Sequence, residues 1–402
     1  MKTSIIFMIL IICGCNTFSQ VDELIPGVFV NPGSCNTYLI KTNDGYVLID
    51  PGSAGNPESV WLKPLKDSVR AVLLTHGHPD HTQYIKEWHE LNVPIYVNRE
   101  FIEFQNYTTR LSGFYFIRNS IQGAPITSTL KNPGNYAATI IPDHFYDESD
   151  TIYAGGIHFI MIHVEGETPD QSLIWVPEKK TVFIGDNYYT SFPAVYTLRG
   201  TEPRWALDYI HALDLALQFN PELLCPGHGK PENGKELIVK KVLRYRNAIQ
   251  YVHDKTVEGM NEGKDVFTLM QEIKLPDSLM IPEFFGRVSW SVRGIYDGYV
   301  GWFDGNITNM YTIPVESIYP ELINLAGGKG TMQKLAEDFF NQKEYVKALH
   351  ATDIILKVFK DDKKILDMRL SIVKALRAIS TNGVEIAWLS HEIDRINQID
   401  SN

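Results

Sequence analysis

The first half of the chain alternates short apolar runs with turn residues. The runs at 37–40 and 46–49 flank Asn43-Asp44-Gly45, which has the composition of a hairpin turn. Apolar runs also predict strands over residues 27–30, 71–74, 94–97, 157–164, 172–176 and 181–184. Helices are expected over residues 84–91 and 203–217, with Pro203 in the first turn of the second. This alternation predicts two sheets covered by helices.

The second half of the chain has a helical pattern. Strand signals stop past residue 236, and helices are predicted over residues 236–259 and 331–359. Within the second helix, one face repeats in steps of three and four residues: Tyr345, Ala348, Thr352, Ile355 and Val358. We therefore expect a helical region that packs on itself and on a second copy of the chain.

Residues 100–150 interrupt the first pattern. They are less regular and rich in Asn, Pro, Tyr and Ser. Because binding residues concentrate on irregular segments, an insertion of this kind is expected to border an active site.

Length and charge narrow the classes of partner. The 402 residues are enough for about two domains, and a hydrophobic content of 44% suits a globular protein with a large core. The formal net charge of −11 disfavours nucleic acid as a partner, because phosphate backbones are bound by Lys and Arg. An anionic substrate would need positive charge at the binding site itself.

The N-terminus has the pattern of a targeting segment. Lys2 precedes an apolar run over residues 5–12, which is too short to cross a bilayer. The stretch Ile12-Cys13-Gly14-Cys15 resembles a bacterial lipobox, in which Cys15 would carry the lipid. We expect a signal peptide over residues 1–20 and export of the mature protein to the periplasm or as an outer-membrane lipoprotein. Such a protein would touch the membrane only through its lipid anchor; the alternative is an ordinary secretory signal cut after Gln20.

The most informative stretch is His76-Gly77-His78-Pro79-Asp80-His81, which follows the strand predicted over residues 71–74. Three imidazoles and a carboxylate thus emerge together at the end of a strand. Both groups are good ligands for zinc-like ions. Four ligands so close in sequence suit two adjacent ions, with His76 and His78 facing one and Asp80 and His81 facing the other.

This stretch resembles the HxHxDH signature of the metallo-beta-lactamase superfamily. Three further motifs occur in the order expected of that family. Val47-Leu48-Ile49-Asp50 ends in Asp50, and Phe183-Ile184-Gly185-Asp186 ends in Asp186. The third motif, Cys225-Pro226-Gly227-His228-Gly229, contains His228. The resemblance covers residues 22–255. It implies an α/β fold, the αββα metallo-beta-lactamase sandwich, followed by an all-α C-terminal domain. We expect the catalytic domain over residues 21–255 and a helical, dimerisation-like domain over residues 256–402.

Other residues resemble the alkyl sulfatase branch of this superfamily. Glu167 stands where many members carry a histidine ligand, nineteen residues before Asp186, and Arg199 follows Asp186 by thirteen residues. The stretches 296–306 and 325–328 resemble the dimerisation domain of that branch. The resemblance implies a homodimeric hydrolase that cleaves sulfate esters, with a small anionic ester as its substrate.

The resemblance also implies a metal ligand set. The first zinc ion would be held by His76, His78 and Glu167, the second by Asp80, His81 and His228, with Asp186 as the bridge. The family has a glutamate at the bridging position, so the shorter aspartate is expected to reshape the bridge. Two Zn²⁺ per chain are expected, although other divalent metals suit similar ligands.

Three residues have further implied roles. Asp80 would also orient the water that the metals activate. Asp50 would orient a ligand imidazole by a hydrogen bond. Arg199 would bind the sulfate oxygens, because its guanidinium presents a planar fork of donors.

Two differences separate the chain from the alkyl sulfatase branch. Trp290, within Val288-Ser289-Trp290, occupies the position of a histidine thought to act as an acid near the leaving group, and an indole cannot act in that way. The branch also usually carries a sterol-carrier-like domain that gathers apolar substrate, and no such domain is expected before Asn402. A smaller or more polar sulfate ester is therefore expected.

Two alternative functions remain open. One is hydrolysis of another ester, a lactone, a beta-lactam or a phosphodiester on the same scaffold. The other is a non-catalytic surface protein that holds a partner through its helical region; Trp290 favours it, and the complete ligand set argues against it. Three further histidines near predicted strands, His144, His158 and His163, are expected to be structural.

Overall fold

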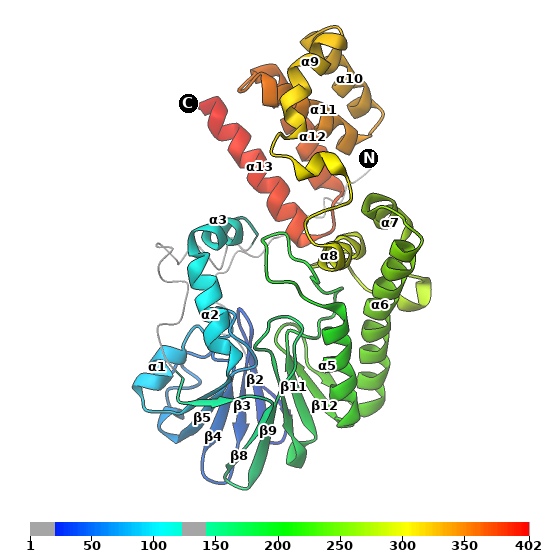
Figure 1. Cartoon of the computed structure of the whole chain (residues 1–402). Helices are drawn as coiled ribbons and strands as arrows, with labels where there is room; N and C mark the ends of the chain where they lie inside the picture. Colours follow the sequence, from blue (N-terminus) through cyan, green and yellow to red (C-terminus); the bar gives the residue numbers. More distant parts are fainter. Residues whose placement is uncertain (1–20, 123–141, 402) are drawn as a thin grey trace, which may run out of the picture. The chain divides into compact units, whose positions relative to one another are not determined.

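The structure is a computed structural model that describes residues 21–122 and 142–401 (Figure 1). The described residues divide into two compact units. The first contains residues 21–116, 142–186 and 216–238, and the second contains residues 117–122, 187–215 and 239–401. Helices α5 (Ala206–Gln218) and α6 (Lys235–Asn261) each contribute residues to both units.

The predicted signal segment, with Cys15, lies outside the described residues. Within the described part of the chain, no helix combines the length and the apolar character that a membrane crossing requires.

The first unit contains a sheet of seven strands in the order β1-β2-β3-β4-β5-β6-β7. These strands are β1 (Asp22–Ile25), β2 (Val28–Pro32), β3 (Asn36–Lys41), β4 (Tyr46–Ile49), β5 (Val69–Leu73), β6 (Ile95–Asn98) and β7 (His144–Tyr146). Strands β1 to β4 pair antiparallel, whereas β4 to β7 pair parallel. The carboxyl ends of β4 and β5 therefore lie at the same edge of the sheet.

The second sheet of this unit has six strands in the order β13-β12-β11-β10-β9-β8. Its strands are β8 (Ser149–Ala154), β9 (Ile157–His163), β10 (Ser172–Val176), β11 (Thr181–Gly185), β12 (Leu223–Pro226) and β13 (Glu232–Asn233). Strands β11 and β12 pair parallel, and the other neighbours pair antiparallel. The carboxyl ends of β11 and β12 thus also lie together.

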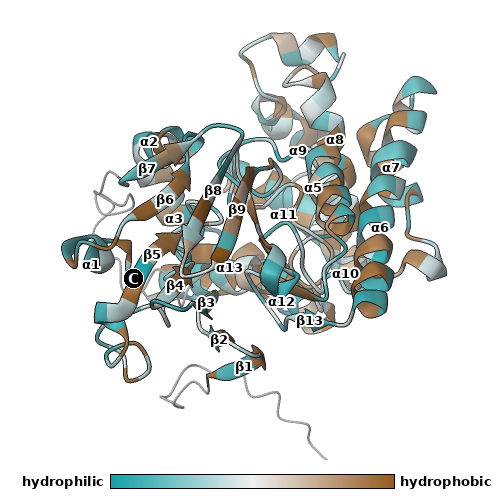
Figure 2. Cartoon of the chain, turned by 90° about the horizontal axis from the view of Figure 1, so that it is seen from below, coloured by the Kyte–Doolittle hydropathy of each residue, from teal (hydrophilic) through white to brown (hydrophobic). Residues whose placement is uncertain are grey.

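Apolar side chains of both sheets form one core. It includes Val47 and Ile49 from the first sheet and Phe159 and Phe183 from the second, and β9 is largely hydrophobic along its length (Figure 2). Since successive side chains of a strand point to opposite faces, the intervening Leu48 belongs to a different cluster. That cluster includes residues of α1 (Ile85–Glu90) and α2 (Glu100–Arg110).

Past α6, the second unit is helical. Its helices are α7 (Val266–Glu272), α8 (Val288–Val300), α9 (Tyr319–Leu325), α10 (Lys329–Asn341), α11 (Tyr345–Val358), α12 (Lys363–Ile379) and α13 (Gly383–Ser401). Consecutive helices from α10 to α13 pack on one another. On the predicted helical face, Ala348, Thr352 and Ile355 are buried. The predicted fold class, an α/β sandwich followed by an all-α region, is confirmed.

Three segments differ from the prediction. Within residues 100–150, which were expected to be irregular, residues 100–122 form α2 and α3 (Ser112–Gln122), because α2 buries an apolar face that includes Phe101 and Phe104. Residues 123–141 of that segment lie outside the described residues. The single helix predicted over residues 331–359 is two helices, since Lys343 takes a left-handed φ of 62°, which interrupts a right-handed helix. The helix predicted from Pro203 begins only at Ala206.

Candidate metal centre

Four strand ends of the first unit deliver the polar residues that the sequence singled out. Asp50 directly follows β4, and the stretch 76–81 follows β5 after two residues. Asp186 directly follows β11, and His228 follows β12 by two residues. Because parallel neighbours carry their carboxyl ends to one edge, these side chains lie where ligand sites commonly form in α/β folds.

The first cluster of possible ligands contains His76, His78 and Asp186. All three are buried, and their ligand atoms lie within 4.8 Å of one another. His76 Nε2 is 2.8 Å from His78 Nδ1 and 3.9 Å from Asp186 Oδ2. Glu167, which precedes β10, places Oε1 4.0 Å from His78 Nδ1. The structure thus brings together the residues expected around the first ion.

The second cluster contains Asp80, His81 and His228. His228 Nε2 is 3.2 Å from Asp80 Oδ2 and 3.3 Å from Asp186 Oδ2. His81 Nε2 is 3.4 Å from Asp186 Oδ1. Asp186 therefore faces both clusters, which is the position that a bridging ligand requires.

Asp50 and Thr75 fix the orientation of His81. Asp50 Oδ1 accepts a hydrogen bond of 2.8 Å from the Thr75 backbone N–H, and Oδ2 accepts one of 2.7 Å from the Thr75 hydroxyl. His81 Nδ1 lies 2.9 Å from Asp50 Oδ2, and an ionised carboxylate only accepts, so Nδ1 is the donor. The other ring nitrogen, Nε2, is then the atom that can bind a metal. Sequence analysis missed Thr75, although it directly precedes the histidine motif.

The site concentrates negative charge around its imidazoles. Burial opposes a charged imidazole at His81, but Cys35 and then Asp186, Asp50 and Asp80 raise its pKa well above the usual value. At His228 burial likewise lowers the pKa, but Asp186 and Asp80 outweigh this effect and raise the pKa to about 10. His76 differs, because burial and the neighbouring His81 lower its pKa well below the usual value. Without a metal, His81 and His228 therefore hold protons beside the carboxylates.

This donor set fits divalent metal ions. Imidazole nitrogens and carboxylate oxygens are ligands that Zn²⁺ and related ions prefer. His81 Nε2 is buried, and within the described residues it makes no hydrogen bond; a bound cation would remove the cost of leaving such an atom unsatisfied. Ions would also replace the protons on His81 and His228, as metal binding to protonated ligands requires.

A glycine allows the loop that carries His228 to approach the site. A Cβ atom at Gly227 would lie 2.1 Å from Asp186 Oδ1 and 2.7 Å from His81 Cε1. Gly227 also donates a backbone hydrogen bond of 2.8 Å to Gly185 O. Any larger residue would force these ligands apart.

Arg199 belongs to the second unit, where residues near the end of α3 hold its loop. Arg118 Nε donates a hydrogen bond of 2.8 Å to Arg199 O, and the Arg199 N–H donates one of 2.9 Å to Gln122 Oε1. The Arg199 guanidinium donates from Nη1 to Asn119 Oδ1 over 3.5 Å. The segment that was expected to be irregular thus positions the arginine expected to bind sulfate.

Trp290 lies near the start of α8 in the second unit. The guanidinium carbon of Arg287 is 5.3 Å from the centre of a Trp290 ring. Arg287 also forms an ion pair with Glu385. Packing against Arg287 is a sufficient structural role for a tryptophan at this position.

The three histidines expected to be structural each have a partner elsewhere. His144 stacks on Tyr96 with ring centres 4.3 Å apart. His158 Nδ1 is 2.6 Å from a carboxylate oxygen of Glu178, and His163 Nε2 is 2.7 Å from the Pro169 carbonyl.

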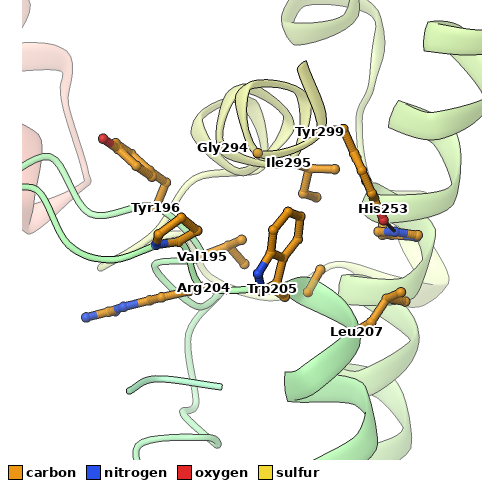
Figure 3. Close-up of a pocket in the computed structure, with 12 residues that line it drawn as sticks. Val195, Tyr196, Arg204, Trp205, Leu207, His253, Gly294, Ile295 and Tyr299 are labelled. Carbon is orange, nitrogen blue, oxygen red and sulfur yellow. Dashed lines mark hydrogen bonds between the residues drawn. The ribbon is translucent and has the colours of Figure 1, made fainter. Parts of the chain in front are cut away.

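A pocket in the second unit is lined by none of the candidate metal ligands or substrate-binding residues (Figure 3). Tyr196 and Trp205 line one part of it, and α8 lines another. A Cβ atom at Gly294 would lie 2.6 Å from Tyr196 Cβ, and one at Gly298 would lie 3.2 Å from the Trp205 ring. These two glycines let α8 pack closely on the loop that also carries Arg199.

Comparison with protein families identifies two matches along the chain. Residues 30–228 match the metallo-beta-lactamase superfamily. Residues 267–391 match the family described as alkyl sulfatase dimerisation.

Curated relatives include several alkylsulfatases. A linear primary-alkylsulfatase from Pseudomonas sp. is 27% identical over 87% of this chain and 71% of its own length. The alkyl/aryl-sulfatase BDS1 of Saccharomyces cerevisiae is 24% identical, and the match covers 77% of this chain and 53% of that protein. An (R)-specific secondary-alkylsulfatase from Pseudomonas sp. is 21% identical over 82% of this chain and 55% of its own length. The chain thus spans about half the length of most of these relatives.

A solved structure has the same fold. The stereoselective inverting sec-alkylsulfatase Pisa1 from Pseudomonas sp. superposes with a TM-score of 0.80 at 18% identity, over 94% of this chain and 66% of that one. The fold and the two ligand clusters together indicate a site for divalent metal ions.

Proposed function

Because the chain belongs to the metallo-beta-lactamase superfamily, in its alkyl sulfatase-like branch, we propose that it hydrolyses sulfate esters at a centre of two zinc ions. The position of Asp186 between the two ligand clusters carries the proposal of two ions. The alkylsulfatases among the relatives, together with Glu167 beside His78, support a sulfate ester as substrate.

Each residue of the centre has a task in this proposal. The first ion would be held by His76, His78 and Glu167, the second by Asp80, His81 and His228, and both by Asp186. Ions bound in this way supply Lewis acidity and allow water to act as a nucleophile near neutral pH. Asp80 would orient that water, and Asp50 keeps His81 Nε2 turned toward the site.

We assign binding of the sulfate group to Arg199. Two or three oxygens of a sulfate can accept from the planar fork of a guanidinium, which is a stronger and more directional contact than a point charge makes. Its backbone is fixed by Arg118 and Gln122 of α3. That arrangement limits the entropy that Arg199 would lose on binding the anion.

Trp290 favours a second candidate function on the same scaffold. An indole cannot protonate a departing alkoxide, so esters with a poor leaving group would react slowly unless another group supplies the proton. A substrate whose leaving group needs no protonation, such as an aryl ester, avoids this requirement. The test below therefore includes these substrates.

We propose a homodimer that forms through an apolar arm, which we define as residues 300–325. Its exposed large apolar side chains are Val300, Trp302, Ile307, Met310, Tyr311, Ile313, Val315, Ile318, Leu322 and Leu325. Besides α9, the arm contains two short 3₁₀ turns, Ile307–Met310 and Val315–Ile318. Monomeric proteins rarely expose so many neighbouring apolar residues. The arm has no Lys or Arg, which disfavours an anionic membrane, and it lies within the dimerisation match.

We further propose that the protein is exported from a bacterial cell, either to the periplasm or with Cys15 carrying a lipid anchor. The support is the sequence of residues 1–20. Mass spectrometry of the mature N-terminus distinguishes a lipidated Cys15 from cleavage after Gln20.

The direct test is release of inorganic sulfate from short, long, branched and aryl sulfate esters. A lactone, a beta-lactam and a phosphodiester are assayed beside them. We expect sulfate release that is lost in His81→Ala and kept in His158→Ala, a control histidine outside the ligand clusters. Turnover of only the other substrates would support the second candidate, and no turnover by a protein with two ions bound would contradict both.

A further inference from the structure

Gly77 lies between His76 and His78, the two histidines expected around the first ion, and is joined to each of them by one peptide group. Its carbonyl accepts a hydrogen bond of 2.7 Å from Gln105 Nε2. Gln105 comes from α2 and is 8% exposed, so this bond is shielded from water. A buried side-chain amide that donates to one backbone carbonyl restricts the rotation of that peptide.

The other side of Gly77 faces a buried carboxyl group. Asp170, which precedes β10, is 2% exposed, and the Gly77 backbone N–H forms a hydrogen bond with its carboxylate. The same peptide stretch is tied to the second sheet by Thr75, whose carbonyl accepts a bond of 2.6 Å from the Ser172 N–H. Gly77 is therefore contacted from α2 on one side and from the approach to β10 on the other.

The space around Gly77 leaves no room for a side chain. A Cβ atom there would lie 2.7 Å from Gln105 Nε2, 2.9 Å from Phe104 Cδ1 and 3.0 Å from Asp170 Oδ2. The Phe104 ring also contacts the His78 ring, with centres 5.5 Å apart. Helix α2 thus constrains both the backbone between the histidines and one of the two rings.

The second cluster is held by different groups. His81 is oriented by Asp50, and Gly227 brings His228 into place through its bond to Gly185. Neither of these contacts includes Gln105 or Asp170. The two halves of the centre therefore share Thr75, which contacts both Asp50 and His76, but only the first half is supported by Gln105.

We propose that Gln105, together with Asp170, is a positioning residue for the first metal ion, because it fixes the Gly77 peptide and with it the relative placement of His76 and His78. This inference rests on the proposed metal centre and adds that binding of the first ion depends on a contact from α2 that the second cluster does not make. Loss of such a supporting contact typically weakens metal binding by about 10- to 100-fold.

The test uses Gln105→Met, which keeps the length of the side chain and removes its donor. It is made in two backgrounds, His228→Ala, which weakens the second site, and His76→Ala, which weakens the first. Zinc affinity is measured by competition with a chromogenic chelator, and Co²⁺ absorption reports the coordination geometry. In the His228→Ala background, we expect Gln105→Met to lower the affinity for the remaining zinc ion by about 10- to 100-fold. In the His76→Ala background, Gln105→Met should leave the affinity for the remaining zinc ion unchanged.

Two controls separate positioning from general destabilisation. Phe101→Leu changes a buried residue of the same helix that packs in a separate apolar cluster, and it should lower the melting temperature without changing zinc affinity. Asp170→Asn keeps an acceptor oxygen for the Gly77 N–H and should bind both ions nearly as well as the natural protein.

The inference would be overturned if Gln105→Met lowered zinc affinity equally in both backgrounds. It would also be overturned if the substitution left zinc affinity unchanged in the His228→Ala background. Because the readout is metal binding, the result is independent of the substrate. A protein that shows the expected background-dependent loss but releases no sulfate would keep this inference and contradict the proposed function.

Discussion

His81 donates from Nδ1 to Asp50 Oδ2 over 2.9 Å, and this bond determines which ring nitrogen faces Asp186. Asp50 is itself held in place by two hydrogen bonds from Thr75, the residue before the histidine motif. The orientation of a candidate metal ligand is therefore fixed by the end of the neighbouring strand, β4, rather than by its own loop.

Asp50→Asn should weaken binding of the second zinc ion. The amide keeps the size of the side chain but removes the charge that fixes the imidazole, so we expect a loss of about 10- to 100-fold in zinc affinity. Affinity for the first ion should change less. Stepwise zinc titration of metal-free protein checks this, and an unchanged second affinity would show that Asp50 does not orient His81.

Metal affinity should rise with pH. Since the pKa of His228 is raised to about 10 and that of His81 is also raised, both rings hold protons at pH 7 that entering ions must displace. Each displaced proton should weaken the apparent affinity by about tenfold for every pH unit below these pKa values. Calorimetry in buffers of different ionisation enthalpy counts the released protons, and pH-independent binding would argue against this charge arrangement.

Gly227→Ala should disrupt the centre. The added Cβ atom would meet Asp186 Oδ1 at 2.1 Å and push the His228 loop away, so zinc content should fall below that of the natural protein. Gly330→Ala is a matched control, because its Cβ atom would meet no atom within 4 Å and it lies in α10. It should be neutral or stabilise the fold by about 0.4–1 kcal/mol. Full zinc content in Gly227→Ala would contradict the close packing.

Asp170→Asn should stabilise the metal-free protein more at high pH than at low pH. Burial raises the pKa of Asp170 from 3.8 to about 7, so the folded state binds a proton that the unfolded state releases between those values. The carboxyl therefore costs stability progressively as pH rises through this window. Between pH 5 and pH 8 the advantage of the Asn variant should grow by about 2–3 kcal/mol. Urea unfolding at both pH values measures it, and an equal difference at both would rule out the raised pKa.

A charge introduced in the apolar arm should break the proposed homodimer. Trp302 is 79% exposed and Leu325 is 85% exposed in the isolated chain. We expect Trp302→Glu with Leu325→Glu to sediment as a monomer at concentrations where the natural protein is a dimer. Val346→Glu, on an exposed position of α11 outside the arm, should remain dimeric. A dimer that survives the arm substitutions would place the interface elsewhere.

Most of the candidate ligand residues could be singled out from the sequence because they lie at the end of a short buried strand or a few residues beyond it. The HxHxDH stretch, Asp50 and Asp186 follow apolar runs, and a parallel sheet collects such ends at one edge. The supports of the centre were not predictable in this way. Gln105 reaches Gly77 from α2, 28 residues further along the chain. Only the packed fold reveals that contact, because it joins two segments that are not neighbours in the sequence.

The helical region shows a second limit on what the sequence alone predicts. The apolar face of residues 345–358 was visible as a repeat of three and four residues, and its central members are buried. The break before it depends on one backbone angle at Lys343, which no residue-type preference indicates. Likewise, the contacts of α3 with the Arg199 loop join residues about 80 positions apart, as Arg118 and Arg199 are.

The most direct measurement is sulfate release as zinc is added back to metal-free protein. The two-ion account predicts little release up to one equivalent of zinc per chain and full release only near two. Full release with no added metal, or no release at two bound equivalents for any sulfate ester, would contradict it.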